Sequence, residues 1–337
     1  MILSSGKINI IIDGQFGSTG KGLLSSYVSV NNKVDIAVSN CSANAGHTFY
    51  YKGSKYIVSS IPVSSIINEH SIIYISAGAV LNVDKFFKEL KMYDIDMSRV
   101  FINPNTCIIT NDDINDEKDV DGPFTKIAST RSGVGAALSR KIRREGNLAK
   151  DDSRLKKFIY KLDLQKLVKD RVVLVETSQG LGLSLNSGYE YPYCTSREIT
   201  VSSTLADIQV HPKFLGKVCA CIRTFPIRVG NIVNNGVIVG DSGPFYDDSY
   251  ETNWDSIGVT PEYTTVTKRK RRVATFSVIQ YKEMLQVLQP DYILLNFCNY
   301  LEKYDLIKLL RKLPEVTHLG FGKYISKVYR RHEYEKC

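Results

Sequence analysis

A glycine-rich turn that directly follows a run of aliphatic residues is the first stretch of this 337-residue chain that could perform chemistry. The run Ile8–Ile12 is typical of a buried strand in a parallel sheet, and the turn after it reads DGQFGSTGKG. Glycines allow the backbone to approach a ligand closely, and a helix that begins near Lys21 would direct its free N–H groups at that ligand. A lysine at a helix start is unfavourable unless an anion is bound. The stretch therefore predicts a phosphate-binding turn, although a strand-to-helix turn can also be glycine-rich for structural reasons alone.

The spacing of this turn differs from that of a Walker A loop. Gly14 and Gly20 enclose five residues where that motif has four, and Gly22 stands where the motif carries the Ser or Thr that holds magnesium. We therefore expect a phosphate site of another kind.

A short polar turn about twenty residues further on holds a histidine. Asn44, Gly46, His47 and Thr48 follow the apolar run Ile36–Val38. A histidine can act as general acid or base because its unperturbed pKa lies near neutrality. A lone histidine is, however, more often a structural residue than a catalytic one.

The two segments together resemble the signature pair of the adenylosuccinate synthetases. GQFGSTGKG and NAGHT match GQWGDEGKG and NNAGHT of that family, which joins aspartate to the 6-position of a purine nucleotide. The other matching blocks follow in the same order and extend almost to the C-terminus: Ser129-Thr130, Gly133–Gly135, Arg144, Glu176–Gly180, Tyr191–Ser196, Arg223–Gly230, Ser242–Phe245 and Tyr263–Val273. The resemblance implies an α/β fold with a mostly parallel central sheet flanked by helices, P-loop-like, and we expect residues 1–337 to form a single domain.

One departure from the family pattern bears on the substrate. The catalytic aspartate of GDEGKG is Ser18 here, and the neighbouring glutamate is Thr19. In the family that aspartate takes the N1 proton of the purine and ligates magnesium, and a serine can do neither in the same way. The chain is more similar to the phage branch of the family, the 2-aminoadenylosuccinate synthetases, in which dGMP is the acceptor. A short neutral side chain leaves room for the 2-amino group of guanine.

The resemblance also assigns residues to ligands. It implies catalytic roles for His47, Ser18 and Lys21, and a Mg²⁺ ion held by Gly46 and Ser18. It implies contacts to the acceptor nucleotide from Asn44, Ser129, Thr130, Arg144, Gln179, Thr195 and Val229. It implies contacts to L-aspartate from Thr265, Val266, Thr267, Arg269 and Arg271. It implies contacts to the phosphoryl donor from Ser18, Thr19, Gly20, Lys21, Gly22, Gly46, His47, Thr48, Asn296 and Gly320.

Two of these assignments depend on further comparison with the family. Where the family carries TKLD to recognise the guanine of GTP, this chain has Leu295–Cys298, without the carboxylate. Asn296 could read an adenine edge, so we expect ATP or dATP as donor. The family residue that matches Arg144 reaches across a dimer interface to the 5′-phosphate of the nucleotide, which implies a homodimer.

The bulk properties agree with an intracellular enzyme and leave one alternative. A net charge of +9 suits anionic partners, and the cluster Lys268–Arg272 could be a solvated loop or a nucleic-acid patch. The family resemblance instead assigns it to a loop that grips carboxylates, so we expect neither nucleic acid nor a membrane as partner. Seven cysteines, five histidines without a zinc pattern and no stretch of membrane-spanning length predict reduced thiols and a cytoplasmic location, in a host cell if the chain is phage-encoded.

Three other functions stay open on the sequence: a conventional adenylosuccinate synthetase that uses IMP, a non-catalytic nucleotide-binding paralogue, and a nucleic-acid-binding module. The coarse pattern predicts strands at Ser71–Ser76, Val172–Val175 and Tyr292–Phe297. It predicts helices at Asp84–Met92, Gly133–Arg144, Leu155–Lys169 and Tyr281–Gln289. The acidic run Asn111–Asp121 is expected to be a loop with solvated carboxylates.

Overall fold

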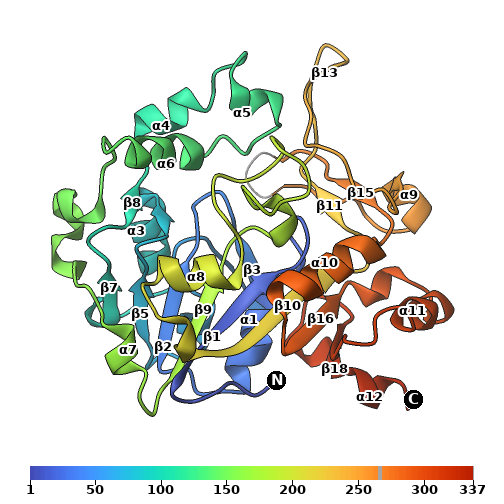
Figure 1. The fold of residues 1–337 in the computed structure, drawn as a ribbon, viewed down its shortest axis with the longest axis horizontal. Helices are drawn as coiled ribbons and strands as arrows, with labels where there is room; N and C mark the ends of the chain where they lie inside the picture. The colour runs from blue at the N-terminus through green and yellow to red at the C-terminus, as the bar shows by residue number, and fades with distance from the viewer. Residues whose placement is uncertain (265–267, 337) are drawn as a thin grey trace.

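The protein is described from a computed structural model that covers residues 1–264 and 268–336. Within these residues a nine-stranded sheet runs through the molecule in the order β18-β17-β16-β10-β1-β9-β2-β5-β7 (Figure 1). Every neighbouring pair is parallel except β17 and β18. The strands are β1 (Lys7–Asp13), β2 (Ile36–Asn40), β5 (Ile72–Ile75), β7 (Val100–Ile102), β9 (Val172–Thr177), β10 (Leu215–Arg223), β16 (Tyr292–Asn296), β17 (His318–Gly320) and β18 (Val328–Arg330).

Apolar clusters cover both faces of this sheet. On one face Ile10, Val175 and Ile222 pack with residues of α8, α10 and α11. On the other face Ile11 and Leu174 pack with residues of α1. Central strands that are buried on both sides are mostly aliphatic on both faces, which is the reason for the apolar runs in the sequence. The α/β fold with a mostly parallel central sheet is thus confirmed.

The helices surround the sheet, and smaller sheets border it (Figure 1). The helices are α1 (Lys21–Val30), α2 (Ser64–Ile67), α3 (Val83–Met92), α4 (Asn111–Asp116), α5 (Pro123–Lys126), α6 (Val134–Ile142), α7 (Leu164–Leu167), α8 (Val201–Asp207), α9 (Trp254–Ile257), α10 (Val278–Leu288), α11 (Lys303–Leu310) and α12 (Arg331–Tyr334). The remaining strands are β3 (His47–Tyr51), β4 (Ser54–Val58), β6 (Val80–Leu81), β8 (Cys107–Ile108), β11 (Ile227–Arg228), β12 (Ile232–Asn234), β13 (Val237–Gly240), β14 (Glu251–Thr252) and β15 (Arg272–Ala274). Across the described ranges no helix is long and apolar enough to cross a membrane.

The prediction of one amphipathic helix over Leu155–Lys169 is wrong. The structure has a 3-10 segment at Ser153–Phe158 and the short helix α7. Leu155 and Phe158 belong to one apolar cluster and Leu164 to another, and a single straight helix could not bury them in both. The backbone N–H of Tyr160 instead donates to the carbonyl of Ile102, which draws the chain alongside β7.

The expectation of a solvated acidic loop over Asn111–Asp121 is also wrong. Its first residues form α4, which begins with a capping box between Thr110 and Asp113. The side chains of Asp113 and Glu117 are buried. Asp113 accepts hydrogen bonds from the Arg140 guanidinium at 2.6 and 2.7 Å. Two carboxylates of this run therefore have structural partners that the sequence did not show.

Asn9 is a polar residue inside the first apolar run, and its side chain joins three parts of the fold. Its Oδ1 accepts from the backbone N–H groups of Ser4 at 2.9 Å and Lys217 at 3.0 Å. Its Nδ2 donates to the carbonyls of Ser4 at 3.0 Å and Val173 at 3.1 Å. Asn9 is completely buried, so these bonds satisfy every polar atom of its amide.

We expect Asn9→Leu to lower the free energy of unfolding by about 3 kcal/mol or more, because buried backbone groups that lose their partner each cost about 1–3 kcal/mol. Urea titration followed by circular dichroism measures this. Asn186→Leu, at an exposed position, is the matched control and should change stability by less than about 0.5 kcal/mol. A similar loss in both variants would contradict the role given to Asn9.

Candidate functional site

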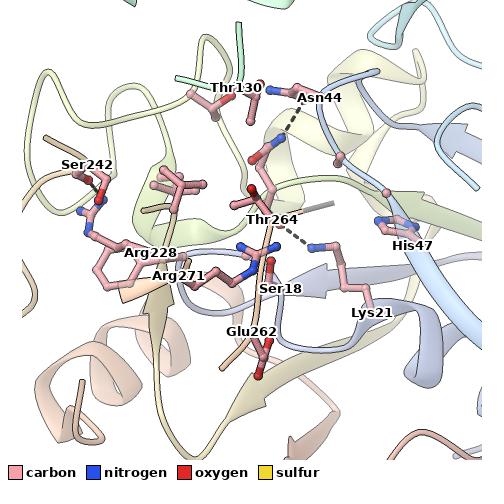
Figure 2. A pocket seen from close by; sticks show the side chains of 18 of the residues that line it. Ser18, Lys21, Asn44, His47, Thr130, Arg228, Ser242, Glu262, Thr264 and Arg271 are labelled. Carbon is pink, nitrogen blue, oxygen red and sulfur yellow. Dashed lines mark hydrogen bonds between the residues drawn. The ribbon is translucent and has the colours of Figure 1, made fainter. Parts of the chain in front are cut away.

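A cavity of about 730 Å³ opens where the central strands end at their carboxyl sides. In open α/β sheets ligands usually bind at this edge. The cavity brings together most of the residues that the sequence singled out: Ser18, Gly20, Lys21, Gly22, Asn44, Gly46, His47, Thr48, Ser129, Thr130, Gln179, Thr195, Val229, Arg271 and Asn296. Figure 2 shows how several of them surround it.

Some predicted residues do not line this cavity. Thr19 and Gly320 are buried behind it, Arg269 lies beside it and Arg144 is exposed after the end of α6. Thr265, Val266 and Thr267 lie outside the described residues. Assignments to them stay predictions.

The glycine-rich turn folds around the side chain of Asp13, a residue that the sequence analysis did not select. Asp13 ends β1 and is completely buried. Its Oδ1 accepts from the backbone N–H groups of Gln15 at 2.9 Å and Gly17 at 3.3 Å. Its Oδ2 accepts from Thr19 Oγ1 at 2.5 Å and from Lys21 Nζ at 3.1 Å. A carboxylate directly before a glycine-rich turn that contains a lysine was the signal that could have revealed it.

The turn then presents α1 to the cavity. Gly17 and Gly20 have φ of 84° and 99°, a left-handed conformation in which glycine is not strained. Ser18 lies between them with φ of 56° and is exposed in the cavity. Among the described residues no side chain caps the N-terminus of α1. Its first N–H groups and Lys21 thus face the cavity as an anion site.

His47 begins β3 and is nearly buried at the cavity wall. Burial, together with the nearby charge of Lys21, lowers the pKa of His47 to about 3. His47 is therefore a neutral imidazole at neutral pH. The unperturbed pKa of histidine therefore does not describe this side chain, and the sequence alone did not show the burial that lowers it.

Neither ring nitrogen of His47 has a hydrogen-bond partner among the described residues. Nδ1 lies 3.9 Å from Glu176 Oε2, which is beyond hydrogen-bond length. Nε2 has no partner within the described part of the chain. Glu176 itself is held by the backbone N–H groups of Val63 and Ser64, both at 2.9 Å. A buried ring nitrogen without a partner at a cavity wall is suited to hydrogen-bond a substrate.

A second group of cavity residues lies near the start of α6. Asn44 Oδ1 accepts from Gln179 Nε2 at 2.8 Å. Glu117 accepts from the N–H groups of Gly133 at 2.7 Å and Gly135 at 2.6 Å, and so closes the N-terminus of α6. Burial raises the pKa of Glu117. An anion near Thr130 would therefore be bound by side chains rather than by free amides of α6.

Arg271 enters the cavity from the segment before β15, and two other arginines lie near it. Arg271 is directed into it (Figure 2), and burial lowers the pKa of Arg271 to about 10, so it stays charged at neutral pH. Arg269 instead donates to the carbonyls of Ala128 at 2.8 Å and Ser129 at 2.9 Å. Arg223, missed by the sequence analysis, forms a short ion pair with Glu262 and lies 3.9 Å from the ring centre of Phe297.

Asn296 braces the glycine-rich turn from the end of β16. Its Nδ2 donates to the carbonyl of Thr19 at 3.2 Å, and its Oδ1 accepts from the N–H of Phe297 at 2.9 Å. A Cβ atom at Gly20 would lie 2.1 Å from Asn296 Nδ2, and one at Gly320 would lie 2.5 Å from its Oδ1. Both glycines are thus needed for close packing. That Asn296 reads an adenine stays a prediction.

The residues of the cavity belong to a known family pattern. The family model "Adenylosuccinate synthetase" matches residues 10–166 and 147–313. The chain belongs to the adenylosuccinate synthetase family. It is therefore a carbon–nitrogen ligase of that family.

Three individual relatives define its place more closely. The N6-succino-2-amino-2′-deoxyadenylate synthase of Salmonella phage PMBT28 is 34% identical over 94% of this chain and 91% of its own. The adenylosuccinate synthetase of Pyrococcus horikoshii is 33% identical over 79% of this chain and 76% of its own. The solved structure of cyanophage S-2L succinoaminodeoxyadenylate synthetase (PurZ), bound to dGMP and dATP as an energy donor, is 31% identical, covers 99% of this chain and 98% of its own, and superposes with a TM-score of 0.87.

The buried neutral state of His47 predicts a specific acid sensitivity. The unfolded chain binds a proton at a histidine with a pKa near 6.5, whereas the folded chain does so only near 3, so stability falls as the pH drops below 6.5. Between pH 7 and pH 5 this term amounts to about 2 kcal/mol. We expect His47→Asn to lose about that much less stability than wild type over this interval, as measured by urea unfolding at both pH values.

The exposed His70 provides the control. His70→Asn should show the same loss of stability as wild type between the two pH values. An equal loss in wild type and His47→Asn would mean that His47 is not held neutral by burial.

Proposed function

We propose that this chain condenses dGMP with L-aspartate, driven by ATP or dATP, to give N6-succino-2-amino-2′-deoxyadenylate for the synthesis of 2-aminoadenine DNA. The family membership supports the reaction type. Relatives with this named activity match over more than nine-tenths of the chain, and a relative of the same fold was solved with dGMP and dATP bound.

The observation that carries the choice of acceptor is Ser18. It occupies the position of the aspartate in GDEGKG, and it is exposed in the cavity. Guanine differs from hypoxanthine by a 2-amino group next to N1. A serine at this position leaves space for that group and offers it a hydroxyl acceptor, whereas an aspartate would be larger and is suited to a base without the group.

The reaction proceeds in two steps. In the first, O6 of the purine attacks the γ-phosphorus, the bond to the β-phosphate oxygen breaks, ADP or dADP leaves, and the N1 proton passes to the carboxylate of the substrate aspartate or to a water bound by Ser18. In the second, the aspartate amine bonds to C6 and loses a proton to solvent, the C6–O bond breaks and phosphate leaves. Lys21 and the free N–H groups of α1 stabilise the transferring phosphoryl group. His47, as a neutral imidazole, donates a hydrogen bond to the oxygen on which charge develops.

The oxygen donors at the turn suit Mg²⁺. The Ser18 hydroxyl and the Gly46 carbonyl are neutral oxygens at the cavity wall, and Mg²⁺ in nucleotide sites takes few protein ligands and several from phosphates and water. We propose that these two residues hold the ion together with the donor phosphates. When bound, it neutralises phosphate charge during transfer.

The arginines near β15 are the proposed site of L-aspartate. Arg271 enters the cavity as a charged group, and a guanidinium can bind a carboxylate through two parallel hydrogen bonds. Arg269 and residues 265–267 complete this site in the proposal. Val229 and Thr195 are assigned to the acceptor nucleotide, with Ser129, Thr130, Asn44 and Gln179.

We also propose that the enzyme is a homodimer. Val134 and Gly135, at the start of α6, line the cavity, whereas Arg144 follows the other end of that helix. At 1.5 Å per residue the two ends lie roughly 14 Å apart. Arg144 is exposed and has a left-handed backbone with φ of 69°, which supports the proposal that it contacts the site of a second subunit rather than its own.

Acceptor choice is the first test of the proposal. Phosphate release with ATP, Mg²⁺ and aspartate should depend on dGMP, with kcat/KM at least ten times that with IMP, because a missing designed contact costs on the order of tenfold or more. Ser18→Asp is expected to shift this ratio toward IMP, and Ser18→Ala, which stays small and neutral, should leave the ratio above one. Release with IMP alone would overturn the proposal in favour of a conventional adenylosuccinate synthetase, and release with neither would favour a non-catalytic paralogue.

Mixing two inactive variants tests the dimer. His47→Asn damages the site of its own chain, and Arg144→Ala damages the site of the partner chain. In a heterodimer both changes therefore fall on the same site, and the other site is intact. Refolding or subunit exchange of an equal mixture should restore about a quarter of wild-type activity, because half the dimers are mixed and half of their sites are intact. An unchanged, inactive mixture that has exchanged subunits would show that Arg144 serves its own chain.

A further inference from the structure

The ammonium group of Lys21 is fixed in place from behind. Lys21 is 6% exposed, and its Nζ donates to Asp13 Oδ2 at 3.1 Å and to the carbonyl of Gln179 at 2.6 Å. An ammonium group has three donors, and within the described residues these are its two acceptors. Since Lys21 lines the cavity, the third donor is available to a ligand there.

Asp13 itself does not touch that ligand space. It is completely buried and is not part of the cavity wall. Gly180 packs directly against it, and a Cβ atom at Gly180 would lie 2.5 Å from Asp13 Oδ1. The carboxylate thus acts on the cavity only through the groups that it holds: Lys21 and the backbone of the turn.

The side chain of Thr19 contacts the same carboxylate oxygen of Asp13 as Lys21 does. Thr19 Oγ1 lies 2.5 Å from the Asp13 oxygen that pairs with Lys21. Thr19 stands where the motif GDEGKG carries its glutamate. A longer acidic side chain at position 19 would therefore extend into the space that the Asp13 carboxylate fills here.

We propose that Asp13 is the positioning residue that fixes Lys21 for phosphoryl transfer, and that it takes the place of a carboxylate at position 19. This inference rests on the proposed function, which assigns Lys21 to the transferring phosphate. With the carboxylate at position 13 instead of position 19, the negative charge lies at the end of β1, behind the turn. Both Ser18 and Thr19 of the turn are then neutral, so the purine meets no charged side chain from these two positions.

A set of three variants tests this inference. Asp13→Asn keeps an oxygen for the N–H groups of Gln15 and Gly17 but removes the charge that holds Lys21. We expect its kcat to fall about 10²-fold, the size of loss seen when one electrostatic group of a transfer site is removed, with a change of less than about threefold in KM for the acceptor. Asp13→Gly should be equally impaired. Asp13→Gly combined with Thr19→Glu should recover kcat to within about tenfold of wild type, because the new carboxylate reaches the same point.

The recovery separates positioning from a structural role. If Asp13 only stabilised the fold, its substitution would lower the melting temperature. It would not lower kcat selectively while the KM for the acceptor stayed nearly constant. Asp13→Asn that keeps more than a third of wild-type kcat would overturn the inference, and so would a folded double variant as inactive as Asp13→Gly. If Asp13→Gly does not fold, recovery of folding together with activity in the double variant supports the inference, and recovery of folding alone overturns it.

Failure of the inference about Asp13 can be distinguished from failure of the proposed function. Each variant is compared with wild type on whichever acceptor wild type uses, dGMP or IMP, so activity with IMP alone overturns the acceptor and leaves this comparison intact. If wild type releases phosphate with neither, titration with a non-hydrolysable ATP analogue and Mg²⁺ takes its place. The Kd should then rise about tenfold in Asp13→Asn and return in the double variant, and equal Kd values in all proteins would overturn the inference.

Discussion

The buried ion pair between Asp13 and Lys21 is the interaction on which the cavity depends. A lysine at the start of a helix is opposed by the helix dipole, and burial adds a large desolvation cost. The carboxylate at the end of β1 offsets both, and its second oxygen holds the backbone of Gln15 and Gly17. One side chain thereby ties the strand, the turn and the helix into a single unit, and the free amides of α1 are directed outward as a result.

The neighbouring charges determine the state of the histidine. Lys21 lies close enough to His47 to disfavour a second positive charge, and burial acts in the same direction. The imidazole is consequently a neutral hydrogen-bonding group rather than a general acid or base at neutral pH. The pairing of a fixed cation with a fixed neutral donor gives a site whose charge pattern is set before substrate arrives, which is the condition for electrostatic stabilisation of phosphoryl transfer.

Sequence patterns predicted the parts of this protein that local rules govern. The aliphatic runs predicted β1, β9 and β16, because strands buried on both faces are mostly apolar. The glycine-rich turn was located because glycine is required by the left-handed backbone at Gly17 and Gly20. The family motifs also selected residues from distant blocks of the sequence, and many of these residues line one cavity in the structure. What failed depended on tertiary contacts: two apolar clusters divided the helix expected over Leu155–Lys169, and Asp113 of the expected acidic loop is buried against Arg140.

Helices α1 and α6, which both contribute residues to the cavity wall, differ in one respect. Glu117 occupies the N-terminal amides of α6, whereas within the described residues the N-terminus of α1 has no side-chain cap. A helix end whose amides are already satisfied attracts anions far less than an open one. The cavity therefore has a direction. Of these two helix ends, that of α1 offers its amides to a polyphosphate chain. Under the proposed function, the triphosphate of the donor would therefore lie at the α1 end, and a nucleotide bound in the opposite orientation would lose these hydrogen bonds.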